Sequence, residues 1–304
     1  MDTLAKAPES KINYGFVVLN YNNYQDTIAC VESILQITHR QDYCIVVVDN
    51  ASPNMSFEIL MSKYSGHIKV TLLSSNVNNG YSAGNNIGIR MLLEMGIEQV
   101  IIATNDTELI SPNILDEFDK LNLSDVGIVG TDVLSVEGKH QNPTLCRPTF
   151  LYYLNMYLFE PMVMLRSGIY KLLPSVERNR RTVLAEEIEN LSAGELLSVS
   201  SVYMLHGCFL FLTKSYLGKV GLLDENLFMY GEEDLMSWNC ERHGLKRLYL
   251  PTIKILHKDG QSTKDIYKEG KDEFVRTMTI KSRKYLANNI GMWGLLKVVL
   301  KDLC

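Results

Sequence analysis

Three adjacent acidic residues, Glu232, Glu233 and Asp234, follow an aromatic–glycine step in the segment FMYGEED. Carboxylates this close repel one another, which raises the pKa of at least one of them and suits it to act as a general base. Acidic residues are also common in the first turn of a helix, where the helix dipole stabilises them. The cluster therefore marks either a catalytic base or the start of a charged helix.

A second group of polar residues closes two apolar runs in the first third of the chain. Asp49 ends the run CIVVVD, and a carboxylate there can accept the imide N–H of uracil or thymine. Asn20 and Tyr21 end the run YGFVVLN and would form the floor of the same pocket. Asp and Asn also cap helices well, so a cap of the next helix by Asp49 and Asn50 is the alternative.

Asp106 lies in the segment TNDTEL directly after another apolar run, and His257 ends a later one. An acid at the end of a central strand is placed to hold a divalent cation, and Mg²⁺ prefers one or two carboxylates plus substrate phosphate oxygens. His257 could complete such a site. An Asp-Thr pair after a strand is equally typical of a turn, and a single histidine there is often a simple polar contact.

The segment SNVNNGYSAGNNIGI carries glycines at 80, 84 and 88, which is not the dinucleotide-binding spacing G-x-G-x-x-G. A spacing of four puts the three glycines near one helix face, where Gly84 and Gly88 would allow close packing on a sheet. Gly80 precedes the helix beside Asn79 and could open a loop toward a phosphate. The helix N-terminus at Ser82 would then help to bind the anion.

The polar residues at the ends of the apolar runs can form one site only if a sheet brings the strand ends together. Apolar runs alternate with segments of helical spacing, which predicts strands buried on both faces of a parallel sheet with right-handed crossovers. Ligands of such sheets bind outside the carboxyl ends of the strands. The predicted strands are Tyr14–Asn20, Cys44–Asp49, Ile68–Leu73, Gln99–Thr104, Val202–Thr213, Leu248–Leu250 and Ile253–His257, the last two on either side of Pro251, and a helix is predicted near Asp234–His243.

Composition excludes several classes of protein. Of the 304 residues, 46% are hydrophobic and 21% charged, which is typical of a globular chain and not of a disordered one. The formal net charge of −5 argues against non-specific electrostatic binding to nucleic acid. The six cysteines form no C-x-x-C pair, which argues against a structural zinc site. Because no secretion signal or membrane span is visible, we expect a cytoplasmic protein with reduced cysteines.

The C-terminal segment is basic, with seven Lys or Arg residues against three acids between Lys271 and Cys304. Apolar residues alternate there with lysines, and Trp293 lies near the start of the most apolar part. This pattern suits an interfacial helix that contacts the inner face of the cytoplasmic membrane. The alternatives are packing against the body of the protein and a contact within a homodimer.

The order of seven segments is the strongest signal. VVLNYNN, VVVDNAS, NNGYSAGNNIGI, TNDTEL, GCFLFL, FMYGEED and LHKDGQST together resemble the family 2 glycosyltransferases, especially bacterial enzymes of the rhamnosyltransferase type that build cell-surface polysaccharides. The resemblance covers about Tyr14 to Thr263. It implies an α/β protein of the GT-A fold, with a Rossmann-like, mostly parallel sheet flanked by helices. It also implies a nucleotide-diphosphate sugar donor, a divalent cation (Mg²⁺ or Mn²⁺) and inversion at the anomeric carbon.

The resemblance also implies roles for the donor-binding residues. Asp49 takes the place of the aspartate that binds the nucleobase. Asn79, Gly80 and Asn85 fall in the loop and helix that line the donor.

The metal motif and the catalytic motif follow from the same resemblance. The segment Thr104-Asn105-Asp106 falls on the Asp-x-Asp metal motif, and because Thr104 replaces the first acid, Asp106 is left as the metal carboxylate. His257 matches a histidine that reaches the metal or the diphosphate. The segment Glu232-Glu233-Asp234 falls on the Glu-Asp catalytic motif. Position for position Glu233 is the base, whereas a shift of one residue would choose Asp234.

The predicted organisation is a GT-A domain at 1–265 followed by a helical tail at 266–304. The domain would have a nucleotide-sugar half at 12–130 and an acceptor half at 131–265, with an insertion near 151–200. The predicted activity is transfer of a sugar from dTDP-rhamnose or a UDP-sugar to a hydroxyl of a glycan or a lipid-linked acceptor.

Two other functions stay open. A sugar-phosphate nucleotidyltransferase would need a Gly-rich basic loop after the first strand, and Asn20–Asp26 contains neither Gly nor Lys. The chain could also be a catalytically inactive binding module of the same fold. Thr104, which replaces the first acid of the metal motif, is the only residue that favours this alternative.

Overall fold

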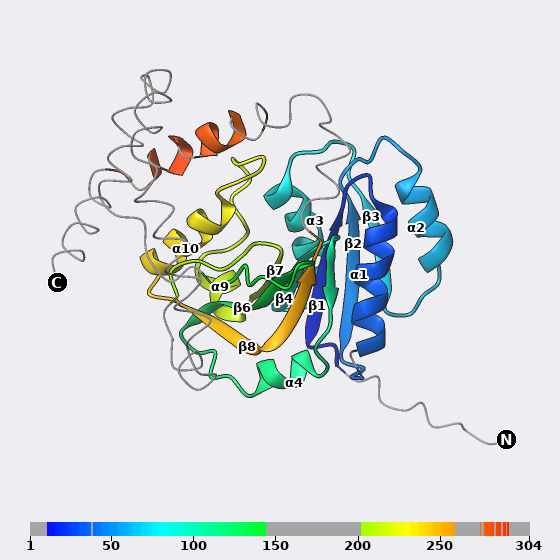
Figure 1. The fold of residues 1–304 in the computed structure, drawn as a ribbon, viewed down its shortest axis with the longest axis horizontal. Coiled ribbons are helices and arrows are strands. Elements are labelled where there is room, and N and C mark those ends of the chain that lie inside the picture. The colour runs from blue at the N-terminus through cyan, green and yellow to red at the C-terminus, as the bar shows by residue number, and fades with distance from the viewer. Residues whose placement is uncertain are drawn as a thin grey trace.

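The computed structural model describes residues 11–37, 39–143 and 202–258, together with part of 274–291 (Figure 1). Within these ranges eight strands form one sheet in the order β3-β2-β1-β4-β7-β6-β8-β5. The predicted insertion near 151–200 and most of the predicted tail lie outside the described residues. The division into a donor half and an acceptor half stays a prediction.

The first half of the sheet is parallel, because β1 pairs in parallel with β2 and β4, and β2 with β3. Its strands are β1 (Tyr14–Asn20), β2 (Tyr43–Asp49), β3 (Val70–Ser74) and β4 (Gln99–Thr104). The helices between them are α1 (Tyr24–Ile37), α2 (Ser56–Tyr64) and α3 (Tyr81–Glu94). The predicted strand at Ile68–Leu73 begins two residues later than expected, because Ile68 is 97% exposed in the turn that follows α2.

Alternation along the strands explains why these runs are so apolar. Phe16 and Val18 pack with residues of α1 and α2, whereas Val17 packs with residues of α3 on the opposite face. β1, like β2 and β4, therefore buries both of its faces between helices (Figure 1). A run of β-branched and aromatic residues is the pattern that such double burial requires.

The second half of the sheet is mixed. β7 lies antiparallel between β4 and β6, and β8 pairs in parallel with β6 and antiparallel with β5. The elements of this half are β5 (Thr107–Leu109), α4 (Ile114–Asp119), β6 (Val126–Ser135), β7 (Phe209–Leu212), α9 (Lys214–Lys219), α10 (Glu232–Arg242) and β8 (Lys246–His257).

Two predicted strands differ from the structure. The apolar run Val202–Thr213 is a strand only over Phe209–Leu212, and the residues before it form a loop. The two strands expected on either side of Pro251 are one strand, β8, whose register against β6 shifts between Leu250 and Lys254. Proline cannot donate to the ladder, so an irregularity at this point lets the strand continue past Pro251.

The glycines of α3 pack against the sheet, as predicted. A Cβ atom added at Gly84 would lie 2.6 Å from the side chain of Leu19, and one at Gly88 would lie 2.6 Å from Val17. Both distances are shorter than real contacts of a Cβ atom. A side chain at Gly84 would therefore displace Leu19, and one at Gly88 would collide with the stiff, β-branched Val17 on β1.

Strand direction brings several segments to one edge of the sheet. Because β7 is antiparallel to β4, its first residue, Phe209, lies opposite Ala103 near the carboxyl end of β4. The N–H of Thr104 donates to the carbonyl of Cys208 at 2.8 Å. The end of β8 reaches the same place, where His257 lies opposite Thr107.

The described residues of 274–291 are helical and pack on the loop that precedes α10 (Figure 1). The Phe274 ring meets Phe228 edge-on, and Tyr285 Oη donates to the Asp224 carboxylate at 2.8 Å. Ser282 Oγ donates to the carbonyl of Met229 at 3.2 Å. Among the helices that the structure describes, none is both long and apolar enough to cross a membrane.

Candidate active site

The acidic cluster forms the first turn of α10, which confirms the helix start, and a catalytic role for one of the acids stays a prediction. Two residues with left-handed backbone precede it, Tyr230 with φ +69° and Gly231 with φ +96°. A non-glycine residue in this region costs on the order of 1–3 kcal/mol and is held there by its surroundings. The Cβ position at Gly231 lies 3.0 Å from Ser282, on the C-terminal helical segment. That segment therefore contributes to holding the turn that presents the acids.

The three acids have different partners. Glu233 Oε1 accepts the N–H of Gly207 at 3.2 Å, whereas the Asp234 carboxylate accepts the hydroxyl of Tyr203 at 3.1 Å. A Cβ atom at Gly207 would lie 2.8 Å from Glu233 Oε1, so a glycine is needed for this approach. Both candidate bases therefore contact the loop before β7, and Glu233 does so at Gly207, the residue directly before Cys208.

Glu232 is buried, with 7% of its surface exposed. Its Oε1 atom has no hydrogen-bond partner among the described residues. Burial, followed by the charge of Glu233, raises the pKa of Glu232 to about 8. The carboxyl group of Glu232 is therefore mainly protonated at neutral pH, and the cluster carries less negative charge than its three acids suggest.

Asp49 is tied to its neighbours at the carboxyl ends of β1 and β2. Its Oδ1 atom accepts hydrogen bonds from Asn20 Nδ2 and Ser52 Oγ, both at 2.6 Å. Its Oδ2 atom accepts the N–H of Ser52 at 3.0 Å. The predicted helix cap is wrong, because α2 begins after Met55 without a side-chain cap. A carboxylate has about four acceptor positions, so these three donors leave room for one more.

Asn20 connects three elements, and Tyr21 beside it is half-buried. Asn20 is fully buried, and its Oδ1 accepts the hydroxyl of Thr27 on α1 at 2.6 Å. Asn105 Nδ2 donates to the carbonyl of Asn23 at 3.0 Å and to Thr27 Oγ1 at 3.1 Å. These bonds tie the ends of β1 and β4 to the start of α1.

The loop before α3 differs from the prediction. Asn78, which the sequence analysis did not single out, accepts the N–H of Gly80 and the Asn50 amide, both at 2.9 Å, whereas Asn79 is exposed. Gly80 has φ +91°, and the N–H of Tyr81 donates to the Phe228 carbonyl at 2.9 Å. The first donor of α3 is therefore used by the loop that leads to the acids. The anion site expected at Ser82, the next residue of α3, stays a prediction.

Asn85 lies one turn further along α3. It is almost fully buried, and its amide donates to the carbonyl of Tyr81 at 3.0 Å. Its Oδ1 atom has no hydrogen-bond partner within the described part of the chain. This oxygen is therefore available to a donor from a ligand or from water.

Asp106 and His257 lie side by side, as their positions at two strand ends predicted. Asp106 is 6% exposed and His257 8% exposed, and His257 Nε2 lies 3.5 Å from Asp106 Oδ2. His257 Nδ1 lies 2.8 Å from Oε1 of Gln141. An amide oxygen only accepts, so Nδ1 carries a ring proton, and Nε2 faces the carboxylate of Asp106.

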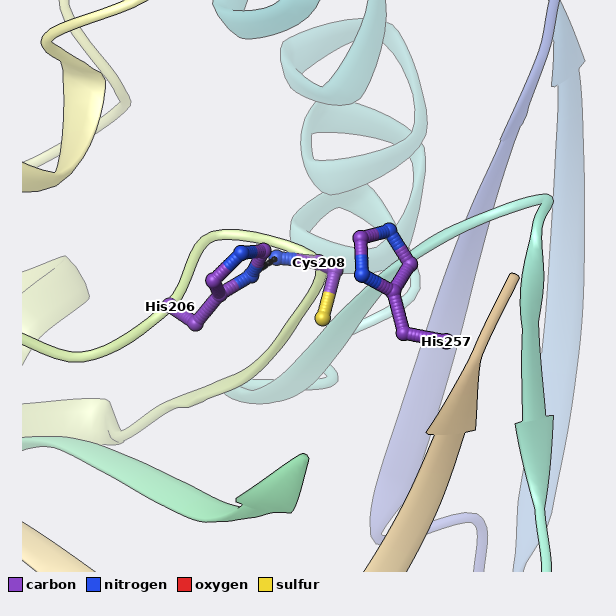
Figure 2. Close-up of side chains that lie close together, drawn as sticks. All are labelled: His206, Cys208 and His257. Carbon is purple, nitrogen blue, oxygen red and sulfur yellow. Dashed lines mark hydrogen bonds between the residues drawn. The ribbon is translucent and has the colours of Figure 1, made fainter. Parts of the chain in front are cut away.

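His206 and Cys208 join His257, which the sequence analysis missed. Their three ligand atoms all lie within 4.8 Å of one another. Figure 2 shows the two imidazole rings on either side of the Cys208 sulfur. The cysteines were judged by C-x-x-C spacing, which says nothing about residues that a distant strand brings together. The segment HGC directly before an apolar run was the available signal.

Gly207 joins the two parts of the site. Its N–H donates to Glu233, and its carbonyl accepts the hydroxyl of Tyr81 on α3. It lies between His206 and Cys208 in the chain, so the candidate base contacts the loop that carries two possible metal ligands. The edge thus combines a carboxylate suited to a nucleobase, a group of possible metal ligands and a carboxylate suited to proton transfer.

This edge of a mostly parallel α/β sheet is the binding site expected for a nucleotide-dependent transferase. Residues 16–139 match the family model described as glycosyl transferase family 2. The family model thus supports the resemblance seen in the seven segments over residues 16–139, and the chain has the GT-A fold.

Two curated relatives align along most of the chain. The low-salt glycan biosynthesis hexosyltransferase Agl10 of Haloferax volcanii is 22% identical over 290 residues, which cover 93% of this chain and 81% of that protein. The dTDP-rhamnosyl transferase RfbF of Shigella flexneri is 25% identical over 247 residues, which cover 81% and 69%.

Among solved structures, GalNAc-T7 with UDP, GalNAc and Mn²⁺ shares the fold with a TM-score of 0.54 and 13% identity. The match covers 82% of this chain and 44% of that chain, so this chain spans less than half the length of that enzyme.

Proposed function

We propose that this chain transfers a sugar from a nucleotide-diphosphate donor to an acceptor hydroxyl, with inversion at the anomeric carbon. The observation that carries the proposal is the contact of Glu233 with Gly207. It brings a carboxylate to the strand edge that also holds Asp49 and Asp106. A base is thus available beside the positions proposed for the nucleotide and for the cation.

Asp49 is proposed to recognise the nucleobase. The acceptor position left on its carboxylate would take the N3–H of uracil or thymine, whereas cytosine has no N–H at that position. The hydrogen bonds from Asn20 and Ser52 fix the carboxylate in one orientation, which reduces the entropy lost on binding. Binding of UDP or dTDP should therefore be clearly tighter than binding of CDP, and equal affinities would count against this role.

Asp106 and His257 are proposed to hold a divalent cation beside the donor diphosphate. The donor set fits, because it offers a carboxylate oxygen and an imidazole nitrogen 3.5 Å apart, and both groups are common ligands of divalent cations. When bound, the cation would neutralise the charge that builds up on the leaving diphosphate. Mn²⁺ in the GalNAc-T7 structure supports a cation in this fold.

Glu233 is proposed to take the proton from the acceptor hydroxyl. The N–H of Gly207 holds its Oε1 atom, which fixes the side chain while Oε2 receives the proton. The oxygen of the hydroxyl then attacks the anomeric carbon from the face opposite the diphosphate. One base suffices for this single displacement, unlike the paired carboxylates of glycosidases.

The donor sugar is proposed from the relatives' names. RfbF is a dTDP-rhamnosyl transferase and Agl10 a hexosyltransferase, which makes dTDP-rhamnose the first candidate and a UDP-sugar the second. The acceptor would be a glycan or a lipid-linked glycan in surface polysaccharide synthesis. Contact with the inner face of the membrane and a homodimer stay proposals, since residues 292–304 lie outside the described part of the chain.

The test is a turnover assay with a panel of nucleotide sugars, with glycan and lipid-linked acceptors. Release of nucleoside diphosphate together with a glycosylated acceptor would support the proposal. Release of pyrophosphate from a sugar phosphate and a nucleoside triphosphate would instead identify a nucleotidyltransferase. Donor binding without turnover across the panel would favour an inactive binding module.

A further inference from the structure

We propose that Arg247 is a positioning residue for the transfer reaction, because it fixes the loop before β7 against α10. The inference rests on the proposed function, in which a carboxylate of α10 takes the proton from the acceptor hydroxyl. Arg247 lies near the start of β8, whereas His257 at the end of this strand lies at the binding edge. Arg247 therefore acts from outside the site, through the two elements that present the acids.

The Arg247 side chain is buried and joins the sheet to two neighbouring elements. Its Nε atom donates to the carbonyl of Val202 in the loop before β7, and its Nη1 atom donates to the carbonyl of Ser237 on α10, both at 3.0 Å. Its Nη2 atom lies 3.4 Å from the carboxylate of Glu241, which is also on α10. Because the guanidinium group is planar and rigid, these bonds set the distance between the loop and the helix.

The loop that Arg247 holds contacts both candidate bases. Tyr203 lies in this loop, and its ring centroid is 5.9 Å from the guanidinium carbon of Arg247. The Tyr203 hydroxyl donates to the Asp234 carboxylate at 3.1 Å. Four residues further along the loop, the N–H of Gly207 donates to Oε1 of Glu233 at 3.2 Å. The position of this loop therefore decides which partners the two acids have.

The carbonyl that Arg247 binds on α10 lies close to the proposed base. Ser237 comes one turn of the helix after Glu233. Arg247 therefore holds the helix just beyond Glu233 and holds the loop shortly before Gly207. One side chain thus fixes both partners of the hydrogen bond between Glu233 and Gly207.

Stability alone does not account for an arginine at this position. Arg247 pairs with Ile128 of β6, which belongs to an apolar cluster with Met236 and Cys240 of α10. A charge placed there carries a desolvation penalty, and apolar residues of similar volume are often equally stabilising. A guanidinium group can instead donate to two separate carbonyls in fixed directions. Proton transfer needs such precision, because a displacement of about 1 Å can cost roughly 100-fold in rate.

The experiment measures turnover and donor affinity of Arg247→Lys in the full-length protein. Lysine keeps the charge, but its single ammonium group on a flexible chain cannot hold both carbonyls in fixed directions. We expect turnover to fall roughly 10–100-fold. The affinity for UDP or dTDP should stay unchanged, since the residues proposed to bind the nucleotide lie at the ends of β1 and β2.

Arg40→Lys is the matched control. Arg40 lies between α1 and β2, at the edge of the sheet opposite the binding site, and forms ion pairs with three carboxylates. The substitution disturbs a comparable set of bonds and should leave turnover normal. Wild-type turnover in Arg247→Lys, or an equal loss of turnover in both variants, would overturn the proposal.

A double-mutant cycle shows whether Arg247 acts through the base. Adding Arg247→Lys to Glu233→Gln, or to Asp234→Asn if that variant loses more turnover, should cause little further loss, because the base is already absent. Losses that multiply would mean that Arg247 only stabilises the fold, and would contradict the positioning role.

Glu241→Gln replaces Arg247→Lys in the cycle if the lysine variant does not fold. It removes the ion pair with Arg247 but keeps an acceptor for Nη2. Turnover should fall in the same way but by a smaller factor, and the fall should again disappear when the base is absent. Unchanged turnover in Glu241→Gln would then reject the proposal.

Hydrogen exchange measured by NMR gives a readout that does not depend on activity. The Gly207 N–H should exchange several times faster in Arg247→Lys, because the loop is then free to move away from Glu233, and at the wild-type rate in Arg40→Lys. Faster exchange in a protein that transfers no sugar from the whole panel would leave Arg247 as the residue that holds the loop and reject the transferase mechanism. Sugar transfer with unchanged exchange and turnover in Arg247→Lys would do the reverse.

Discussion

Within the acidic cluster, neighbouring carboxyl groups differ because their surroundings differ. Glu232 is buried, Glu233 accepts the Gly207 N–H, and Asp234 accepts the Tyr203 hydroxyl. Burial favours the neutral form of Glu232, whereas the other two carboxylates have polar partners. The cluster is therefore better described as three separate groups than as one patch of negative charge.

Replacing the proposed base should remove turnover without removing donor binding. Glu233→Gln keeps the shape of the side chain but cannot accept the proton, so we expect turnover to fall roughly 10²–10⁴-fold. Asp234→Asn keeps an acceptor for the Tyr203 hydroxyl and should lower turnover much less. Turnover rates and nucleotide affinity should be measured for both variants. A larger loss of turnover in Asp234→Asn than in Glu233→Gln would identify Asp234 as the base.

Burial of Glu232 should make stability depend on pH. Its pKa is about 8 in the folded protein and 4.5 without the fold, so between these values the folded chain keeps a proton that the unfolded chain releases. The contribution of Glu232 to the free energy of unfolding is therefore complete below about pH 4.5 and is lost as the pH rises toward 8. Each unit of pKa difference corresponds to about 1.4 kcal/mol.

Urea unfolding of the wild type and of Glu232→Gln across this range measures the effect. The variant cannot ionise, so its stability should fall less steeply with pH. Glu225→Gln is the control, because the hydrogen bond from Asn86 and the charge of Arg90 lower the pKa of Glu225. Titration of Glu225 therefore affects the free energy of unfolding only at more acidic pH. Identical slopes for wild type and Glu232→Gln would show that Glu232 is ionised when folded.

α3 packs against the loop before α10. An element of the predicted nucleotide-sugar half therefore contacts an element of the predicted acceptor half. The carbonyl of Phe228 receives the N–H of Tyr81 and would lie 2.0 Å from a Cβ atom at Gly80. The same loop is held from its other side by Ser282 and Tyr285. The position of the acids therefore depends on two helices that are far apart in the sequence.

Gly80→Ala tests this coupling. The alanine would be strained at φ +91° and would also collide with the Phe228 backbone. We expect a loss of about 1–3 kcal/mol from the strain, because φ +91° with ψ −171° is a conformation nearly restricted to glycine, and a further loss of about 1–3 kcal/mol from the collision, together with reduced turnover. Chemical denaturation and the turnover assay provide the two measurements.

Gly66→Ala is the matched control for this experiment. Gly66 has φ +78°, but nothing lies within 4 Å of its Cβ position. Gly66→Ala should show the cost of a positive φ without a collision and should keep normal turnover. Equal effects of the two substitutions would mean that the loop moves aside easily at Gly80 and that the contact with Phe228 does not position the acids.

At the scale of the whole molecule, the C-terminal segment is predicted to bring the protein to a membrane that carries its acceptor. The basic, apolar end of the chain predicts contact with an anionic bilayer, and the described helix before it packs on the body through Phe274 and Tyr285. This packing would keep a membrane-bound tail close to the acidic cluster. The charge and apolar content of the tail make the contact sensitive to salt.

Liposome flotation at low and high salt tests this prediction, with the full chain compared with one that ends at Asn289. The full chain should float with anionic vesicles at low salt, less at high salt and not with neutral vesicles. The shortened chain should stay in solution. Equal flotation of both, or none by either, would exclude the tail as a membrane anchor.

Local patterns were enough to predict much of this fold. β1, β2 and β4 are buried on both faces, so each is a continuous apolar run whose polar end marks the binding edge. The ordered segments likewise predicted the family, and Asp106 and His257 were placed together because each ends a strand. β6, although ten residues long and almost fully buried, was missed, since its glycines and Asp132 interrupt the apolar pattern.

The remaining features depend on contacts between distant parts of the chain. His206 and Cys208 reach His257 because β7 runs antiparallel beside β4, a pairing that joins residues about a hundred positions apart and leaves no local trace. The burial of Glu232 and the partners of Glu233 and Asp234 depend in the same way on how α10 packs against the loop before β7. Residue types and strand ends thus predicted which groups are available for chemistry. Long-range packing decided the protonation, the orientation and the neighbours of those groups. The reason is that the burial of a side chain and the direction in which it points depend on the whole folded chain.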